Sequence, residues 1–198
     1  MEARQPVEQK KYTYEDYMEW PEDFRAELID GEIYALASPT GPHQRVKGRL
    51  FTKLDVFLEG KTCVPFDAPY DLRFVESKRA KDVVQPDIMV VCDPKKIHNE
   101  CIIGAPDLII EVLSPGTAVR DFNKKKELYE RNGVKEYWLV SPPDRVIYQF
   151  KLVNDQYEDT VITQGRIESY AIEGFGFALE ELFSVLSIFN QKPGGEGM

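Results

Sequence analysis

Two apolar runs in the middle of the chain each carry one acidic residue. Asp87 directly precedes the run 88–91, and Glu111 lies inside the run 108–113. Runs of this length and composition are typical of strands that are buried on both faces of a sheet. An ionised carboxylate in such a strand is unfavourable unless a metal, a hydrogen-bond donor or a cation compensates it. The two acids therefore indicate either a metal site or structural ion pairs.

Glu111 is a more specific indication of a functional site than Asp87. Pro86 has no N–H and suits the start of a strand. Pro-Asp pairs also occur in ordinary turns, so Asp87 considered alone is predicted to be a turn residue. Glu111 is the stronger indication because it stands inside Leu-Ile-Ile-Glu-Val-Leu, and a lone buried glutamate is rare. Its structural alternatives are an edge strand, where it faces water, and a carboxylate paired with an arginine.

A lysine-rich segment after the second run supplies a candidate cation. Residues 117–132 have the pattern of an amphipathic helix, and counting about 100° per residue defines its buried face. This face is predicted to consist of Ala118, Val119, Phe122 and Tyr129. Lys125 falls within it, whereas Lys124 points to solvent and Lys126 flanks it. Lys125 can therefore bring an ammonium to Glu111, the alternative being a lysine whose stem lies on the core and whose head reaches water.

Asp87, Glu111 and Lys125 together have the composition of a magnesium site. Mg²⁺ is commonly held by one or two carboxylates together with waters and substrate phosphate. The lysine can position a water, or offset the negative charge that develops when a phosphodiester is attacked. Each residue alone has an ordinary structural explanation, so only the three together point to chemistry. The two histidines, His43 and His98, are too few to suggest a zinc cluster.

The segments before this site read as a mixture of helices and strands. Thr13 begins a short helix, and Asp30-Gly31 between two apolar stretches predicts a β-hairpin over 27–37. A second helix ends at Gly60, and its apolar face is predicted to consist of Val46, Leu50, Leu54, Phe57 and Leu58. Short strands are predicted over 63–66, 70–75, 88–91 and 108–113.

The segments after the site predict one further helix and a β-meander. Thr117 is the predicted N-cap of the helix 117–132 and Gly133 its stop, and this crossover implies that some strands pair in parallel. Antiparallel strands are predicted over 136–140, 145–152, 156–163 and 166–170, followed by a short helix over 177–186. The fold class is therefore α/β, with a mixed central sheet flanked by helices and a C-terminal antiparallel meander.

Length and composition indicate one folded domain. The 198 residues divide into a flexible N-terminus (1–11), a single domain (12–187) and a flexible tail (188–198). Three cysteines without a Cys-x-x-Cys pair predict reduced thiols in a cytoplasm. No apolar run has the length that crosses a bilayer. The net charge of −9 argues against a surface that coats nucleic acid but leaves room for a local basic groove.

Four segments together resemble a known family. They are residues 27–32 (Glu-Leu-Ile-Asp-Gly-Glu), 85–87 (Gln-Pro-Asp), 106–115 and 121–138. The combination resembles the widespread restriction endonuclease family that was formerly a domain of unknown function, a branch of the PD-(D/E)XK nuclease superfamily. The resemblance covers residues 12–185 and implies a restriction-endonuclease-like fold that hydrolyses DNA with Mg²⁺, for which Mn²⁺ can substitute.

The resemblance also implies roles for particular residues. The superfamily pattern places a lysine two residues after the second acid, but Leu113 stands there, so the lysine has migrated to the next helix, where Lys125 matches. Asp87 and Glu111 match the metal ligands, and the Val112 carbonyl is a further candidate ligand. The supporting candidates are Glu27, His43, Asp71, Gln85 and Tyr129.

Some of these supporting roles can be specified. Gln85 and Tyr129 are placed to bond phosphate or to orient Lys125. The structural alternative for His43 is a residue at the entry of a helix, directly after Pro42.

Three functions are compatible with the sequence. The first is a Mg²⁺-dependent DNA phosphodiesterase, expected to act as a homodimer because it must face two strands, with the aromatic C-terminal strands as the contact. The second is a catalytically silent binding or regulatory protein with a nuclease fold. The third is a structural α/β module in which Glu111 and Lys125 form an internal ion pair. Metal binding separates the third function from the others, and cleavage separates the first two.

Overall fold

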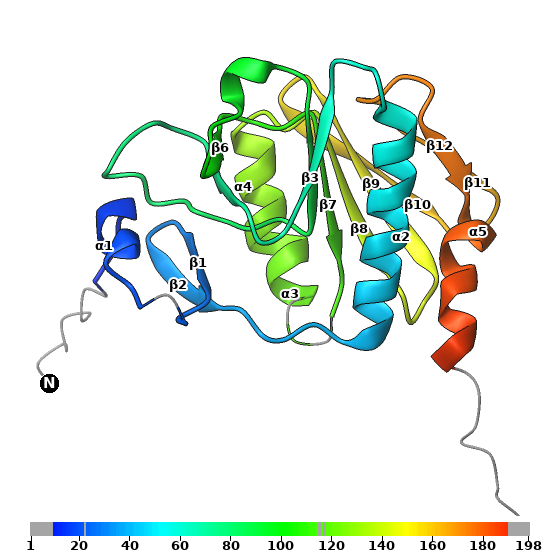
Figure 1. The fold of residues 1–198 in the computed structure, drawn as a ribbon, viewed down its shortest axis with the longest axis horizontal. Helices are drawn as coiled ribbons and strands as arrows, with labels where there is room; N and C mark the ends of the chain where they lie inside the picture. The colour runs from blue at the N-terminus through cyan, green and yellow to red at the C-terminus, as the bar shows by residue number, and fades with distance from the viewer. Residues whose placement is uncertain (1–9, 22, 115, 117, 190–198) are drawn as a thin grey trace, which may run out of the picture.

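A six-stranded mixed β-sheet forms the centre of the protein (Figure 1). The computed structural model describes residues 10–189 except 22, 115 and 117. The strands lie in the order β10-β9-β8-β7-β5-β3, with bounds β3 Val64–Asp67, β5 Ile88–Val91, β7 Leu108–Val112, β8 Glu136–Ser141, β9 Val146–Val153 and β10 Gln156–Ile162. Within this sheet β7 and β8 pair in parallel and the other neighbours pair antiparallel. The helical crossover between β7 and β8 permits the parallel pairing.

Helices cover both faces of the sheet, each over its own apolar core. On one face α2 (Gly41–Leu58), α5 (Leu179–Phe183) and the 3₁₀ helix η3 (Ser184–Phe189) pack on strand residues that include Ile88 and Ile110. On the other face α4 (Lys126–Arg131) packs on residues that include Met89 and Ile109 (Figure 1). The alternation follows from the two-residue period of a strand. Among the described residues, no helix is long and apolar enough to cross a membrane.

The N-terminal part of the chain forms a small lobe beside the sheet (Figure 1). It contains α1 (Tyr14–Met18) and the hairpin of β1 (Ala26–Ile29) with β2 (Glu32–Ala35), whose turn has Asp30 and Gly31 at φ 51° and 74°. Positive φ at both central residues is what a tight hairpin requires. Backbone hydrogen bonds join Leu28 to Val83, and Val84 to Leu72 of β4 (Asp71–Arg73). The hairpin is thereby fastened to the segment that leads into Asp87.

The predicted fold class is confirmed, with local corrections. The structure adds β6 (Cys101–Ile103), which pairs in parallel with β4, and the 3₁₀ turn η1 (Pro94–Lys96). The segment predicted as a helix from residue 177 starts instead as β12 (Gly176–Ala178), paired with β11 (Arg166–Glu168). Three-residue strands depend on distant partners, so the local pattern does not reveal them.

The predicted terminal segments 1–11 and 188–198 fall mostly outside the described residues, as does Thr117, the predicted N-cap. Of the segment 1–11, residues 10 and 11 are described, and Lys11 pairs with Glu32 at 2.8 Å. Of the segment 188–198, residues 188 and 189 are described and belong to η3. The structure therefore describes two residues of each predicted terminal segment.

The helix that carries Lys125 is not a regular α-helix. It starts as α3 (Ala118–Arg120), passes through a π-helical turn, η2 (Asp121–Lys125), and continues as α4. A π turn holds more residues than an α turn, so residues before it lose the phase of a uniform helical wheel. The predicted buried face is therefore wrong for Val119, which is 78% exposed. The predictions for buried Lys125 and exposed Lys124 are confirmed.

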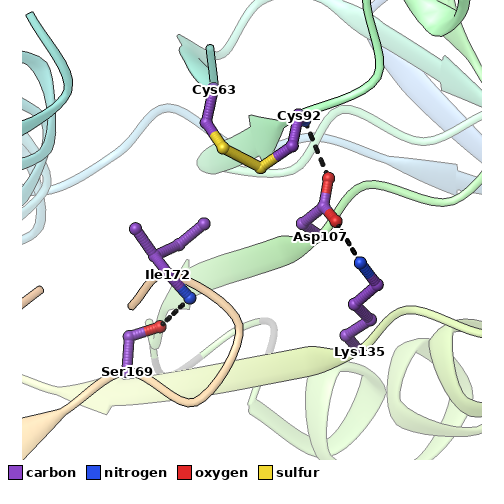
Figure 2. Close-up of a disulfide and its surroundings, with 6 residues drawn as sticks. All are labelled: Cys63, Cys92, Asp107, Lys135, Ser169 and Ile172. Atoms are coloured by element: carbon purple, nitrogen blue, oxygen red, sulfur yellow. Dashed lines mark hydrogen bonds and ion pairs between the residues drawn. A yellow bond between two sulfur atoms is a disulfide. The ribbon is translucent and has the colours of Figure 1, made fainter. Parts of the chain in front are cut away.

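A disulfide joins Cys63 to Cys92, which corrects the prediction of three reduced thiols (Figure 2). Val64 pairs with Val91 across β3 and β5, so the next pair along the ladder places the two cysteines opposite each other. This register cannot be read from cysteine spacing. Asp107 lies beside the bridge: its carboxylate accepts the Cys92 N–H at 2.8 Å and pairs with Lys135 at 2.7 Å (Figure 2). Cys101 is a buried free thiol.

Reduction of this bridge is expected to lower the free energy of unfolding by about 2–4 kcal/mol, because a cross-link restricts the unfolded chain. The cysteines are 29 residues apart in sequence. Urea unfolding with and without dithiothreitol measures the difference, and Cys63→Ser serves as the control because its stability should not respond to the reductant. Identical midpoints for oxidised and reduced wild type would contradict the expectation.

Candidate active site

A cavity of about 250 Å³ opens between the start of α2, the segment after β2, the start of β5 and the end of β7. Its acidic and basic lining residues are Arg25, His43, Lys47, Asp87, Glu111, Arg120, Asp121 and Lys125. Asp87, Glu111 and Lys125 are thus brought together as predicted, although each comes from a different segment. No single stretch of sequence contains the site.

Glu111 and Lys125 form the buried centre of this site. The Lys125 Nζ lies 2.7 Å from the Glu111 Oε1, and the Tyr129 hydroxyl donates to the same oxygen at 2.9 Å. Lys125 is 2% exposed and Glu111 5%. The strand alternation turns Glu111 towards the face that α4 covers, where the π turn and α4 present the lysine and tyrosine. A structural edge-strand position for Glu111 is thereby excluded.

Glu27 provides a second carboxylate for the same ammonium. Its Oε1 lies 2.8 Å from the Lys125 Nζ and accepts the Gln85 N–H at 2.9 Å. The side chain is fully buried, and Arg120 approaches its Oε2 at 3.5 Å. Glu27 stands on β1, which the bridge to Val83 holds against the chain just before Gln85. The hairpin therefore contributes to the site through this one residue.

Asp87 is held from two sides. Its Oδ2 accepts the Val112 N–H at 2.8 Å and lies 3.0 Å from the His43 Nε2. The Asp87 N–H in turn donates to the Glu111 Oε2 at 3.3 Å. Among the described residues, no hydrogen bond reaches the Asp87 Oδ1. The carboxylate therefore has one oxygen fixed by the protein and one left for a ligand.

Acidic groups outnumber basic groups around Glu111. Burial raises the pKa of Glu111 to about 8; the Lys125 ammonium acts against this, while Asp87, Asp121 and Glu27 raise it further. For Lys125, burial alone would lower the pKa, but Glu111, Glu27 and Asp121 outweigh it and raise the pKa above its ordinary value. The site thus keeps its lysine charged and holds more carboxylates than its own cations neutralise.

The raised pKa of Glu111 predicts a stability that falls with rising pH. Between about pH 4.5 and 8 the folded metal-free protein keeps a proton on Glu111 that the unfolded chain has released. The unfolded state then binds fewer protons, so the free energy of unfolding decreases with pH, by at most about 1.4 kcal/mol per pH unit. Urea unfolding in EDTA from pH 5 to 8 measures this, with Glu111→Gln as the reference. A wild-type stability that increases relative to Glu111→Gln across this range would contradict it.

The side chains of two supporting candidates, Gln85 and Asp71, bond each other. The Gln85 side chain donates to Asp71 at 2.9 Å and lies 3.5 Å from the Tyr17 hydroxyl, which also bonds Asp71 at 3.1 Å. Gln85 lines the cavity, whereas Asp71 is not one of its described lining residues. Gln85 contacts Lys125 indirectly, because its backbone N–H donates to the Glu27 carboxylate that pairs with Lys125. A contact between Gln85 and phosphate stays a prediction.

Sequence reasoning missed four charged residues of the cavity lining, which are Arg25, Lys47, Arg120 and Asp121. Arg120 and Asp121 line the cavity one turn before Lys125, and Asp121 is buried. Lys47 lines it from α2, where its ammonium bonds the Ala68 carbonyl at 2.9 Å and Asp67 at 3.3 Å. The spacing of four residues between Asp121 and Lys125, and between His43 and Lys47, was the available signal, because residues four apart share a helix face.

The carboxylates fit a Mg²⁺ site in which waters supply most of the ligands, and they do not fit a metal centre with three or more protein side chains. Among residues 10–189 other than 22, 115 and 117, no group of three or more His, Cys, Asp or Glu side chains is arranged to hold a metal. Mg²⁺ needs only one or two carboxylates with waters and a phosphate. Asp87 has its Oδ1 available, Glu111 lies beside it, and the excess of acids calls for a cation. The Val112 carbonyl remains a predicted ligand.

The chain is similar to known proteins in sequence and in structure. Residues 14–180 match the Uma2 family, described as "Putative restriction endonuclease". The chain belongs to this family. An uncharacterized protein of Synechocystis sp. is 28% identical over 182 residues, covering 89% of this chain and 94% of that protein. The crystal structure of a putative DUF820 nuclease from Anabaena variabilis has a TM-score of 0.73 at 21% identity, covering 88% of this chain and 98% of that one.

The packing around Leu113 fits the absence of a lysine at this position. In this Uma2 protein Leu113 packs in the core under α4 with Leu128 and Tyr129, and its N–H bonds the Val140 carbonyl at 2.8 Å. A lysine at that position would have to leave this core. Lys125 reaches Glu111 from the helix instead. The cation that pairs with Glu111 thus comes from outside the strand that holds this glutamate.

Proposed function

We propose that this protein is a Mg²⁺-dependent endonuclease that hydrolyses DNA phosphodiester bonds with water as nucleophile. The observation that carries the proposal is the convergence of Asp87, Glu111 and Lys125 on one cavity, with the ammonium 2.7 Å from the glutamate. The family match supports a nuclease-like activity. The Mg²⁺ requirement and the DNA substrate are the proposed additions, and Mn²⁺ is expected to substitute.

The residues of the site have separate roles in this reaction. Asp87 and Glu111 hold the ion, with the Val112 carbonyl as a further ligand. A bound Mg²⁺ supplies a more acidic water and polarises a phosphoryl oxygen. An ammonium has three donors, and Lys125 uses two for Glu27 and Glu111. The third is available for the attacking water or for the charge that develops on the phosphate.

Basic residues at the cavity allow local binding of nucleic acid although the protein as a whole is acidic. The chain carries a formal charge of −9, which opposes binding of nucleic acid over a broad surface. Arg25, Lys47 and Arg120 nevertheless line the same cavity as the acids. Among the described residues, Arg25 forms no ion pair. We infer a local contact with a few phosphates, for which the affinity depends only moderately on salt.

A homodimer is part of the same proposal, because cutting both strands of a duplex requires two sites. The aromatic C-terminal strands are the proposed contact. Sedimentation velocity of the purified chain measures the oligomeric state, and a monomer at the concentrations that cleave DNA would remove this element without affecting the site.

The test of the function is incubation of supercoiled and linear DNA with the purified protein in Mg²⁺ or Mn²⁺. Glu111→Ala and Lys125→Ala are run in parallel, with circular dichroism to show that they fold. Cleavage by the wild type alone supports the proposal. Intact DNA in all three samples contradicts it, and metal binding by a wild type that does not cleave would favour the catalytically silent regulatory protein.

A further inference from the structure

His43 occupies a buried position that helix entry alone does not explain. It stands in the first turn of α2, where Thr40 is the N-cap, and it is 8% exposed. Its Nε2 lies 3.0 Å from the Asp87 Oδ2, and its buried Nδ1 has no partner among the described residues. A buried polar atom without a partner in the lining of a cavity indicates that a water or a substrate group in the cavity forms a hydrogen bond with it.

The hydrogen bonds around Asp87 determine which tautomer of His43 is present. The Asp87 Oδ2 already accepts the Val112 N–H at 2.8 Å, so the contact with Nε2 requires a second donor. The Nε2 therefore carries hydrogen, and in the neutral ring the Nδ1 is an acceptor. Two donors now fix one oxygen of Asp87, and the Oδ1 is the oxygen that faces a ligand.

Two hydrogen bonds through Ala68 connect the start of α2 to Asp87. Lys47, one turn after His43, bonds the Ala68 carbonyl at 2.9 Å, and the Ala68 N–H donates to the Asp87 carbonyl at 3.1 Å. The start of α2 is thus tied to the residue that its histidine contacts. A side chain held in this way limits the rotation of its partner.

We propose that His43 is a positioning residue that orients Asp87 for the metal through its Nε2–H, and that its Nδ1 accepts a hydrogen bond from a water or substrate donor in the cavity. This inference rests on the proposed function. It assigns to His43 a role towards the ion without making it a ligand. Residues that orient a metal ligand typically contribute about 10- to 100-fold to metal affinity or activity.

Two amide variants separate this role from packing. Glutamine places its amide nitrogen near the position of Nε2, whereas asparagine places it near Nδ1. Isothermal titration with Mn²⁺ is expected to give His43→Gln a Kd close to wild type, and His43→Asn a Kd raised by about 10- to 100-fold. Thermal unfolding shows that both variants fold. His98→Asn, at the exposed second histidine, is the matched control and should not change the Kd.

The outcomes distinguish the inference from the function on which it rests. If the wild type and His43→Asn bind Mn²⁺ equally while Asp87→Asn does not bind, the positioning role is wrong and the metal site stands. Equal losses in His43→Gln and His43→Asn would also overturn it, in favour of ring packing. A wild type that binds no Mn²⁺ and does not cleave DNA removes both. Cleavage assays of His43→Gln then test Nδ1, since this variant retains the donor and loses the acceptor.

Discussion

Replacing Lys125 with methionine is expected to lower the free energy of unfolding by about 3–5 kcal/mol, the usual effect of breaking a buried ion pair from one side. The variant leaves the Glu27 and Glu111 carboxylates buried without the ammonium that lies 2.8 Å and 2.7 Å from them. Urea unfolding at pH 9 in EDTA, above the pKa of about 8 at which Glu111 ionises, measures the loss. Lys124→Met, at the exposed neighbouring position, is the matched control and should change stability by no more than about 0.5 kcal/mol.

A double-mutant cycle tests the physical reason for this effect. In Glu111→Gln/Lys125→Met the glutamine is neutral, so the combined loss should be smaller than the sum of the two single losses. Additive losses would show that the lysine contributes through its stem and not through its charge. Lys125→Met should also abolish DNA cleavage, because methionine offers no donor to the water or the phosphate.

Replacing Asp87 with asparagine is expected to reduce DNA cleavage by about a thousandfold or more, because loss of a metal ligand removes several kcal/mol of transition-state stabilisation. The fold should be retained, since the asparagine oxygen can still accept the Val112 N–H. Initial rates on a duplex substrate and Mn²⁺ titration measure the two effects. Asp55→Asn, on the exposed face of α2, is the control. An Asp87→Asn variant that cleaves DNA at the wild-type rate would exclude Asp87 as a ligand.

The parts of the fold that were predictable from the sequence have strong local patterns. The apolar spacing of α2, the Asp30-Gly31 turn and the apolar runs of β5 and β7 each specify their own element. β6 and β12 have three residues each and form only because a partner strand is present. The disulfide depends on the register of β3 and β5, which is a tertiary property.

The centre of the site was predictable for a similar reason. Glu111 is conspicuous in an apolar run, and Lys125 can be placed by counting along one helix. Glu27 was no more than a supporting candidate, because its contact with Lys125 depends on how the hairpin docks beside the segment at Val83. Val119 was misplaced because the π turn changes the helical phase, which composition does not reveal.

The wide separation of Glu27 and Lys125 along the chain has a consequence for synthesis in the cell. A nascent or truncated chain that ends before Lys125 contains all three of Glu27, Asp87 and Glu111 but not the ammonium that makes their burial tolerable. Such a chain cannot assemble the site, and contacts between distant segments form slowly. The protein is therefore expected to become able to act on DNA only after the helix that carries Lys125 has left the ribosome and docked.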